Sequence, residues 1–199
     1  MRKICDEHDI LLAADEVQSG FCRTGRMFAT EYWKEAGCEP DILVTAKSIA
    51  AGLPLSAVVT REEIMEAVPA GTIGGTYCGN ALSCAAALKT IELMERIIWQ
   101  SGHRKSERRL WDRYEKMKEK YEPVGDVRGL GAMIGMEFVK DKKTKEPDPQ
   151  FVKDLVQECV QYGLMIESAG VYGNVIRFLA PLVITDEQLE AGLDILEMQ

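Results

Sequence analysis

Histidine, paired cysteines and long apolar runs are scarce in this sequence. His8 and His103 are its two histidines, and its six cysteines contain no Cys-x-x-Cys pair. A structural metal site needs several such ligands at close spacing, so we expect no metal and free thiols, which fit a reducing cytoplasm. No apolar run approaches a membrane span, and the N-terminal residues contain no apolar signal core. The sequence therefore predicts a cytoplasmic protein without a membrane partner.

Basic residues are also in the minority. The 24 lysines and arginines are outnumbered by 32 aspartates and glutamates, which gives a net charge of −8. A nucleic-acid-binding surface requires the opposite balance, so we expect no nucleic-acid partner. Hydrophobic residues make up 46% of the chain and charged residues 28%, which is ordinary for a globular protein with a packed core.

The first hundred residues alternate strand signals with helix signals. Apolar runs at 10–14, 42–45 and 55–60 predict three strands, and residues 28–36 predict a helix between the first two. Such alternation favours a mainly parallel sheet with helices on its faces. We therefore predict an α/β fold in which residues 1–100 form part of a large domain.

The rest of the chain predicts a smaller unit. Residues 101–121 are expected to form a linking helix, separated from the preceding helix at Gly102, and residues 122–199 a small α+β C-terminal domain. Gly129 and Gly131 indicate a turn between two strands.

Two helix starts carry capping signals. Asn80 is a favourable N-cap for the long helix that follows it. Thr185 and Gln188 have the spacing of a capping box, which predicts the start of the last helix.

Two charged residues stand where predicted strands end. Asp15 follows the run 10–14, and Lys47 follows the run 42–45. In open α/β sheets ligands bind outside the carboxyl ends of the strands, so neighbouring strands would bring this acid and this amine to one crevice. A structural ion pair is the commoner explanation of a single acid at a strand end, and it stays open here.

Two further features suit anions. The loop GTIGGTYCGN contains Thr76 and precedes a helix start, an arrangement that can bind phosphate, although glycine-rich loops are usually plain turns. Arg177 lies in the apolar stretch VIRFLAP, where its planar guanidinium suits a carboxylate. An internal ion pair with Glu137 or Glu167 would explain Arg177 equally well.

An amine, an acid, a phosphate loop and a carboxylate clamp are the parts that a pyridoxal 5'-phosphate (PLP) enzyme requires. The segments LLAADEVQSGFCRTGRMFATEY, PDILVTAKSIAAGLPLSAVV and GGTYCGNALSCAAAL resemble the class III (ornithine/4-aminobutyrate-type) aminotransferases of fold type I. The segment YGNVIRFLAPLVITDEQLEAGLDIL resembles their C-terminal domain. The resemblance covers essentially the whole chain and implies PLP as the cofactor.

The resemblance also implies a role for each candidate site residue. Lys47 matches the lysine that forms the Schiff base with PLP, and Asp15 matches the partner of the pyridinium nitrogen. Val17 matches the side chain that packs on the ring, and Gln18 the residue that hydrogen-bonds its phenolic oxygen.

Two other roles concern a second subunit and the substrate. Thr76 matches the threonine that reaches the phosphate of the other subunit's cofactor, so the resemblance implies a homodimer with shared active sites. Arg177 matches the arginine that binds the carboxylate of the amino acid or 2-oxo acid.

The expected activity is transfer of an amino group from an ω-amino acid such as 4-aminobutyrate to 2-oxoglutarate. Class III racemases, epimerases and decarboxylases share the lysine and the aspartate, so they remain alternatives. Members of the family are longer at the N-terminus, so the chain is expected to be the C-terminal half of such an enzyme. A catalytically silent fragment is therefore a third possibility.

Overall fold

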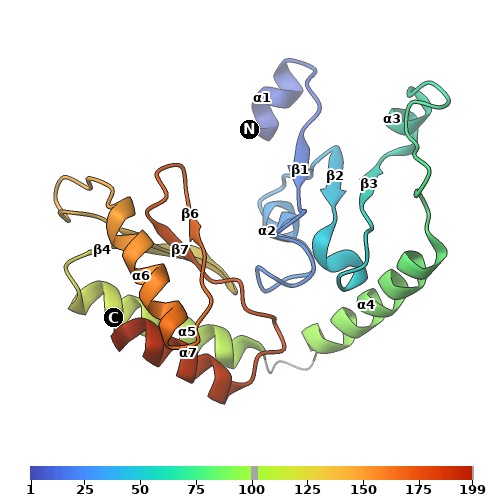
Figure 1. Ribbon diagram of the computed structural model, residues 1–199. Coiled ribbons are helices and arrows are strands. Elements are labelled where there is room, and N and C mark those ends of the chain that lie inside the picture. The colour runs from blue at the N-terminus through green and yellow to red at the C-terminus, as the bar shows by residue number, and fades with distance from the viewer. Residues whose placement is uncertain (100–102, 199) are drawn as a thin grey trace. The chain divides into compact units, whose positions relative to one another are not determined.

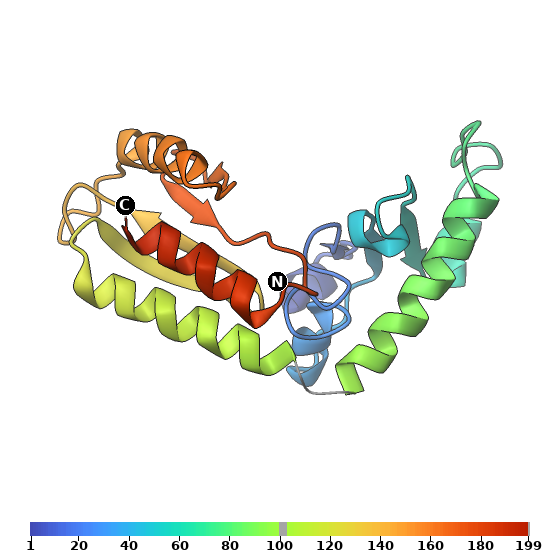
Figure 2. The same cartoon turned by 60° about the horizontal axis from the view of Figure 1, so that its bottom comes forward.

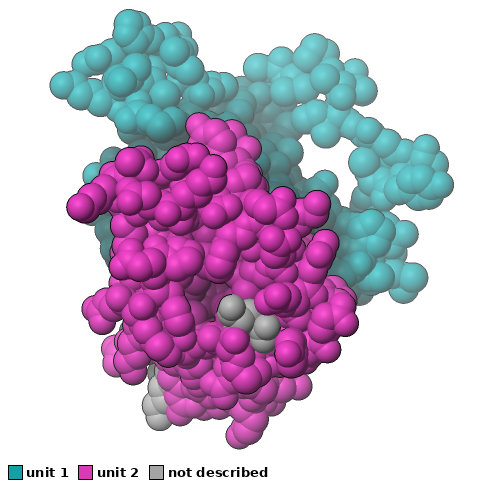
Figure 3. Space-filling view, turned by 60° about the vertical axis from the view of Figure 1, so that its left-hand side comes forward, with its two compact units in different colours: residues 1–100 teal, residues 101–199 magenta. Residues whose placement is uncertain are grey.

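The computed structural model describes residues 1–99 and 103–198, and the chain divides into two compact units, 1–100 (unit 1) and 101–199 (unit 2) (Figure 3). Each unit contains its own sheet and its own buried core. The predicted interruption at Gly102 lies outside the described residues. The division into a large domain, a linking helix and a small domain stays a prediction.

Unit 1 contains the three strands that the sequence predicts for residues 1–100. Its elements are α1 (Arg2–Glu7), β1 (Ala13–Asp15), α2 (Thr30–Glu35), β2 (Ile42–Thr45), the 3-10 helix η1 (Lys47–Ala50), β3 (Ala57–Thr60), α3 (Glu62–Glu66) and α4 (Ala81–Trp99). The strand β2 has the predicted bounds, whereas β1 and β3 begin later than predicted. The exposed side chains of Ile10 and Leu11 precede β1 without joining it.

The sheet of unit 1 has the order β1-β2-β3 (Figure 1). The pair β1–β2 is parallel and the pair β2–β3 is antiparallel. The α/β class is therefore confirmed, but a mainly parallel sheet is not. Residues 46–56, which join β2 to β3, contain only the short helix η1. A parallel return needs a crossover of a dozen or more residues, so this connection favours an antiparallel pair.

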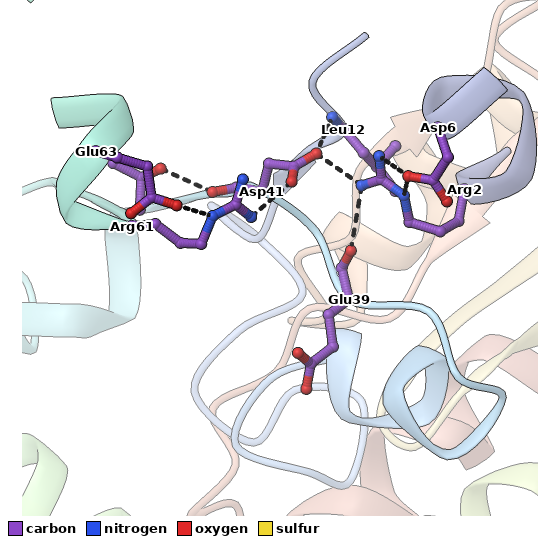
Figure 4. Close-up of polar contacts among 8 residues, drawn as sticks. Arg2, Asp6, Leu12, Glu39, Asp41, Arg61 and Glu63 are labelled. Carbon is purple, nitrogen blue, oxygen red and sulfur yellow. Dashed lines mark hydrogen bonds and ion pairs between the residues drawn. The ribbon is translucent and has the colours of Figure 1, made fainter. Parts of the chain in front are cut away.

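Asp41 joins three segments at one end of this sheet (Figure 4). Its Oδ2 atom accepts hydrogen bonds from the backbone N–H of Leu12, at 2.7 Å, and from Arg2, at 2.6 Å. Its Oδ1 atom accepts one from Arg61 at 2.7 Å, and its carbonyl oxygen accepts one from Thr60 Oγ1 at 2.7 Å. These contacts tie the chain just before β1 and β2 to the end of β3, and so support the register of the sheet.

This arrangement predicts an acid-sensitive unit 1. The Leu12 N–H, Arg2 and Arg61 hold the pKa of Asp41 well below its usual range. A carboxyl whose pKa is depressed by folding stabilises the folded state above its unfolded pKa of about 3.9, and this contribution is lost as the pH falls further. We expect Asp41→Asn to be less stable than the wild type at pH 7, with the difference shrinking below about pH 4.

Urea denaturation followed by circular dichroism at several pH values measures this difference. Glu35→Gln is a suitable control, because Glu35 pairs with Arg26 at the surface and its side chain is 64% exposed. A difference between wild type and Asp41→Asn that does not vary with pH would contradict the assignment.

The helix α4 supports the segment that carries Lys47. Its start is capped as predicted, because Asn80 Oδ1 accepts a hydrogen bond from the Ser83 N–H at 3.1 Å. Ala87 of α4 belongs to one buried cluster with Ile49 and Ala50 of η1. The small side chains allow the helix and η1 to pack closely.

Unit 2 is an antiparallel sheet with helices packed against it (Figures 1 and 2). Its elements are α5 (His103–Lys120), β4 (Val124–Leu130), β5 (Met133–Phe138), α6 (Pro149–Gln161), β6 (Ser168–Ala169), β7 (Val175–Arg177) and α7 (Asp186–Met198). The strand order is β4-β5-β7-β6, and every pairing is antiparallel. The helix α5 packs on β4 and lies beside α7, as Figure 2 shows.

The core of unit 2 lies between these helices and one face of the sheet. Ile134, Met136 and Phe138 alternate along β5 and are buried, together with residues of α5, α6 and α7. The last helix begins with the predicted capping box: Thr185 N donates to Gln188 Oε1 at 3.1 Å, and Gln188 N donates to Thr185 Oγ1 at 3.2 Å. None of the helices within the described residues is both apolar and long enough to cross a membrane.

Candidate active site

Asp15 and Lys47 lie at the carboxyl ends of adjacent parallel strands. Asp15 is the last residue of β1 and stands opposite Val44 of β2. The ladder continues one residue further, where the Glu16 N–H donates to the Val44 carbonyl at 2.8 Å. Lys47 begins η1, directly beyond the end of β2. The strands are therefore neighbours, which the interpretation of a shared acid and amine requires.

The carboxylate of Asp15 is exposed and held at one oxygen. The backbone N–H of Val17 donates to Asp15 Oδ1 at 3.0 Å. Within the described part of the chain, no hydrogen bond reaches Oδ2. Such a carboxylate has a fixed orientation and one oxygen available to a ligand.

Lys47 has an unusual backbone conformation that sequence reasoning did not predict. Its φ is +45°, in the left-handed region that side chains other than glycine rarely adopt. This conformation costs roughly 1–2 kcal/mol, so the surrounding packing has to maintain it. The side chain is exposed in unit 1, beyond the buried residue Thr45. Strained backbone of this kind is concentrated at functional sites.

Val17 and Gln18 lie in the turn that follows Asp15, and both are half-buried. The turn ends at Gly20, whose N–H donates to the Glu16 carbonyl at 3.1 Å. A Cβ at this position would lie 2.8 Å from that same carbonyl oxygen and 3.2 Å from the ring of Phe28. The close approach therefore requires glycine. The turn keeps both side chains next to the end of β1.

Thr45 is a polar residue at this edge that sequence reasoning missed. Its side chain is buried, and Oγ1 has no hydrogen-bond partner among the described residues. A buried hydroxyl without a partner costs about 1–3 kcal/mol. The sequence feature that could have revealed Thr45 is its position as a lone threonine at the end of an otherwise apolar run.

Thr76 lies in a loop that is exposed throughout in this chain. A Cβ at Gly74 would meet no atom of a described residue within 4 Å, so this part of the loop is not packed against those residues. Within the described residues no hydrogen bond joins Thr76 to Asp15 or Lys47. The role of Thr76 toward the cofactor of another subunit stays a prediction.

Arg177 is the last residue of β7 and stands opposite Gly135 of β5. It lines a cavity of about 350 Å³ in unit 2, together with Glu167 and mainly apolar side chains. Glu137, a suggested ion-pair partner, instead pairs with Arg128. Because Arg177 belongs to unit 2, its place relative to Lys47 stays a prediction.

The donor set at the strand ends of unit 1 fits PLP. An exposed amine can hold the cofactor aldehyde, and a carboxylate with one available oxygen can hold a protonated ring nitrogen. The buried hydroxyl of Thr45 adds a polar atom that has no hydrogen-bond partner among the described residues. An α/β unit with an acid and an amine at the ends of adjacent strands is of the type found in PLP-dependent enzymes.

Comparison with known proteins gives the family. Residues 1–199 match the class III aminotransferase family along their whole length, and the chain belongs to that family. It is 43% identical to 4-aminobutyrate aminotransferase GabT of Escherichia coli, over 98% of this chain and 45% of that protein. It is 44% identical to 5-aminovalerate aminotransferase DavT of Pseudomonas putida, over 99% of this chain and 45% of that protein. Class III aminotransferases depend on PLP.

Solved structures agree with this assignment. A Bacillus anthracis aminotransferase matches with a TM-score of 0.84 and 34% identity, over 99% of this chain and 46% of that one. An amine transaminase from an uncultivated Pseudomonas species, in a PLP-bound form, matches with a TM-score of 0.85 and 34% identity, over 98% of this chain and 45% of that one. The chain therefore spans about half the length of the relatives it matches.

Proposed function

We propose that the protein transfers an amino group from an ω-amino acid to 2-oxoglutarate, with PLP attached to Lys47. The placement of Asp15 and Lys47 at the ends of paired parallel strands is the observation that carries the proposal. The named relatives act on 4-aminobutyrate and 5-aminovalerate, which supports a donor whose amine is far from its carboxylate.

Each candidate site residue has a separate role in the proposed reaction. When bound, PLP supplies an aldehyde that condenses with amines and a ring that withdraws electrons from the substrate. Lys47 Nζ would hold the cofactor and, when free, would move the substrate proton. Asp15 Oδ2 would hold the proton of the ring nitrogen, Val17 would cover one face of the ring, and Gln18 would donate to its phenolic oxygen. In unit 2, Arg177 would bind the substrate carboxylate.

The proposal includes a homodimer in which Thr76 contacts the phosphate held by the other subunit. Large apolar side chains are exposed around this loop and along the first half of α4: Ile73, Tyr77, Leu82 and Leu88. Tyr77 is 88% exposed in the isolated chain. Exposed apolar groups gathered in one region support an interface rather than a solvated surface.

A chimeric enzyme tests this function. Residues 1–199 would replace the matching segment of E. coli GabT, of which they cover 45%. We expect the folded chimera to convert 4-aminobutyrate and 2-oxoglutarate into the corresponding aldehyde and glutamate in equal amounts. With 5-aminovalerate as the second donor, the same assay measures preference within the class. A folded chimera without transfer, or one that keeps its activity after Lys47→Ala, would refute the proposal.

The alternatives give other products. A racemase or epimerase would change the stereochemistry of an amino acid without consuming 2-oxoglutarate, and a decarboxylase would release carbon dioxide. A silent 199-residue chain would bind PLP neither tightly nor through Lys47. Titrating the chain with PLP, with Lys47→Ala as the control, distinguishes this last case.

A further inference from the structure

Glu16 is a buried carboxylate directly beside Asp15. It is 2% exposed, whereas Asp15 is exposed. Successive side chains of a strand point to opposite faces, so the two neighbouring acids face different surroundings. Carboxylates are rarely buried unless polar partners satisfy them. The burial of Glu16 therefore requires an explanation of its own.

The partners of Glu16 come from three segments. Its Oε1 accepts a hydrogen bond from the Thr30 N–H at 2.7 Å, at the start of α2, and its Oε2 accepts one from Ser19 Oγ. Its own N–H donates to the Val44 carbonyl of β2 at 2.8 Å. No lysine or arginine forms an ion pair with it among the described residues. Glu16 thus links the strand end, the following turn and α2 through neutral donors.

The turn that Glu16 holds also orients Asp15. Residues 16–20 carry Val17, whose N–H fixes Asp15 Oδ1 at 3.0 Å, and Gln18 follows it. We propose that Glu16 is a positioning residue that aims the Asp15 carboxylate and Gln18 at the cofactor ring. This inference rests on the proposed function. It adds to that function a buried residue that supports Asp15 and Gln18, which are proposed to contact PLP.

A double-mutant cycle on PLP binding tests the coupling. We expect Glu16→Gln to raise the dissociation constant for PLP about tenfold, but less than about twofold when Asp15→Asn is already present, because residues that act through one another are not additive. An equal loss of PLP affinity with Asp15 present and with Asp15→Asn would mean that Glu16 only stabilises unit 1, which would overturn the inference. Glu31→Gln is the matched control, since Glu31 also accepts a backbone hydrogen bond, from Phe28 at 2.9 Å, but is exposed.

A second measurement needs no cofactor. Amide hydrogen exchange of the chain reports the order of the turn through the N–H groups of Val17 and Thr30. Glu16→Gln should accelerate exchange at both amides about tenfold or more, and Glu31→Gln should leave both unchanged. Unchanged exchange in Glu16→Gln would overturn the inference. If the wild-type chain binds no PLP, the proposed function fails for this chain, while exchange still decides the role of Glu16.

Discussion

Replacing Lys47 by glycine should abolish covalent capture of PLP and yet leave unit 1 more stable than replacing it by alanine. Capture is lost because Lys47 supplies the amine that the cofactor aldehyde requires. Alanine keeps the cost of roughly 1–2 kcal/mol for φ +45°, whereas glycine adopts this conformation freely but loses about 0.5–1 kcal/mol of chain entropy. The net difference should favour glycine by about 0.5–1 kcal/mol.

Borohydride reduction followed by peptide mass spectrometry measures capture, and urea denaturation measures stability. Lys34 and Lys89 are internal controls, because both are exposed and ion-paired at the surface. We expect PLP on the peptide of Lys47 in excess over theirs, and only in the wild type. Equal labelling of all three lysines would contradict the proposal that PLP is attached to Lys47. A glycine variant less stable than the alanine variant would show that the backbone there is not strained.

Gly129→Ala should destabilise unit 2 by at least about 3 kcal/mol, which is at or above the upper end of what most single substitutions cost. A Cβ at Gly129 would lie 2.0 Å from the carbonyl oxygen of Met133 and 2.8 Å from the Cα of Ile134. Both atoms belong to the backbone of the paired strand β5, so no side-chain rotation can relieve the overlap. The β4–β5 pair would have to separate, which would expose part of the core.

Gly192→Ala is the matched control in the same unit. Gly192 lies within α7, and among the described residues a Cβ there would meet Leu164 Cδ1 alone, at an ordinary contact distance of 3.4 Å. Alanine is favoured over glycine inside a helix by roughly 0.5–1 kcal/mol, so this variant should be slightly more stable than the wild type. Thermal unfolding of both variants checks the prediction. Similar effects of the two substitutions would contradict it.

The three strands of unit 1 and two helix caps were predictable because their signals are local. Runs of apolar residues marked the positions of β1, β2 and β3, and the caps at Asn80 and Thr185 depend on residues a turn apart. The direction of β3 was not predictable from its own residues. Its antiparallel pairing with β2 depends on the path of the connection, which no local pattern encodes.

Some residues of the candidate site could likewise be predicted from the sequence, and others could not. Asp15 and Lys47 could be singled out because each directly follows an apolar run, and a strand presents its last residues at the edge of the sheet. Glu16 looked like a second strand-end acid, and only its contacts with Ser19 and Thr30 distinguish it from Asp15.

The sequence by itself determined the family of this protein and which residue types stand at the strand ends, because both depend on identity and order along the chain. The tertiary structure decided how those residues are used. Packing leaves Asp15 exposed and Glu16 buried, and it holds Lys47 at a left-handed φ. It also leaves Thr45 Oγ1 with no hydrogen-bond partner among the residues that the structure describes. These features arise from contacts between segments distant in sequence, where burial and hydrogen bonding outweigh local preference.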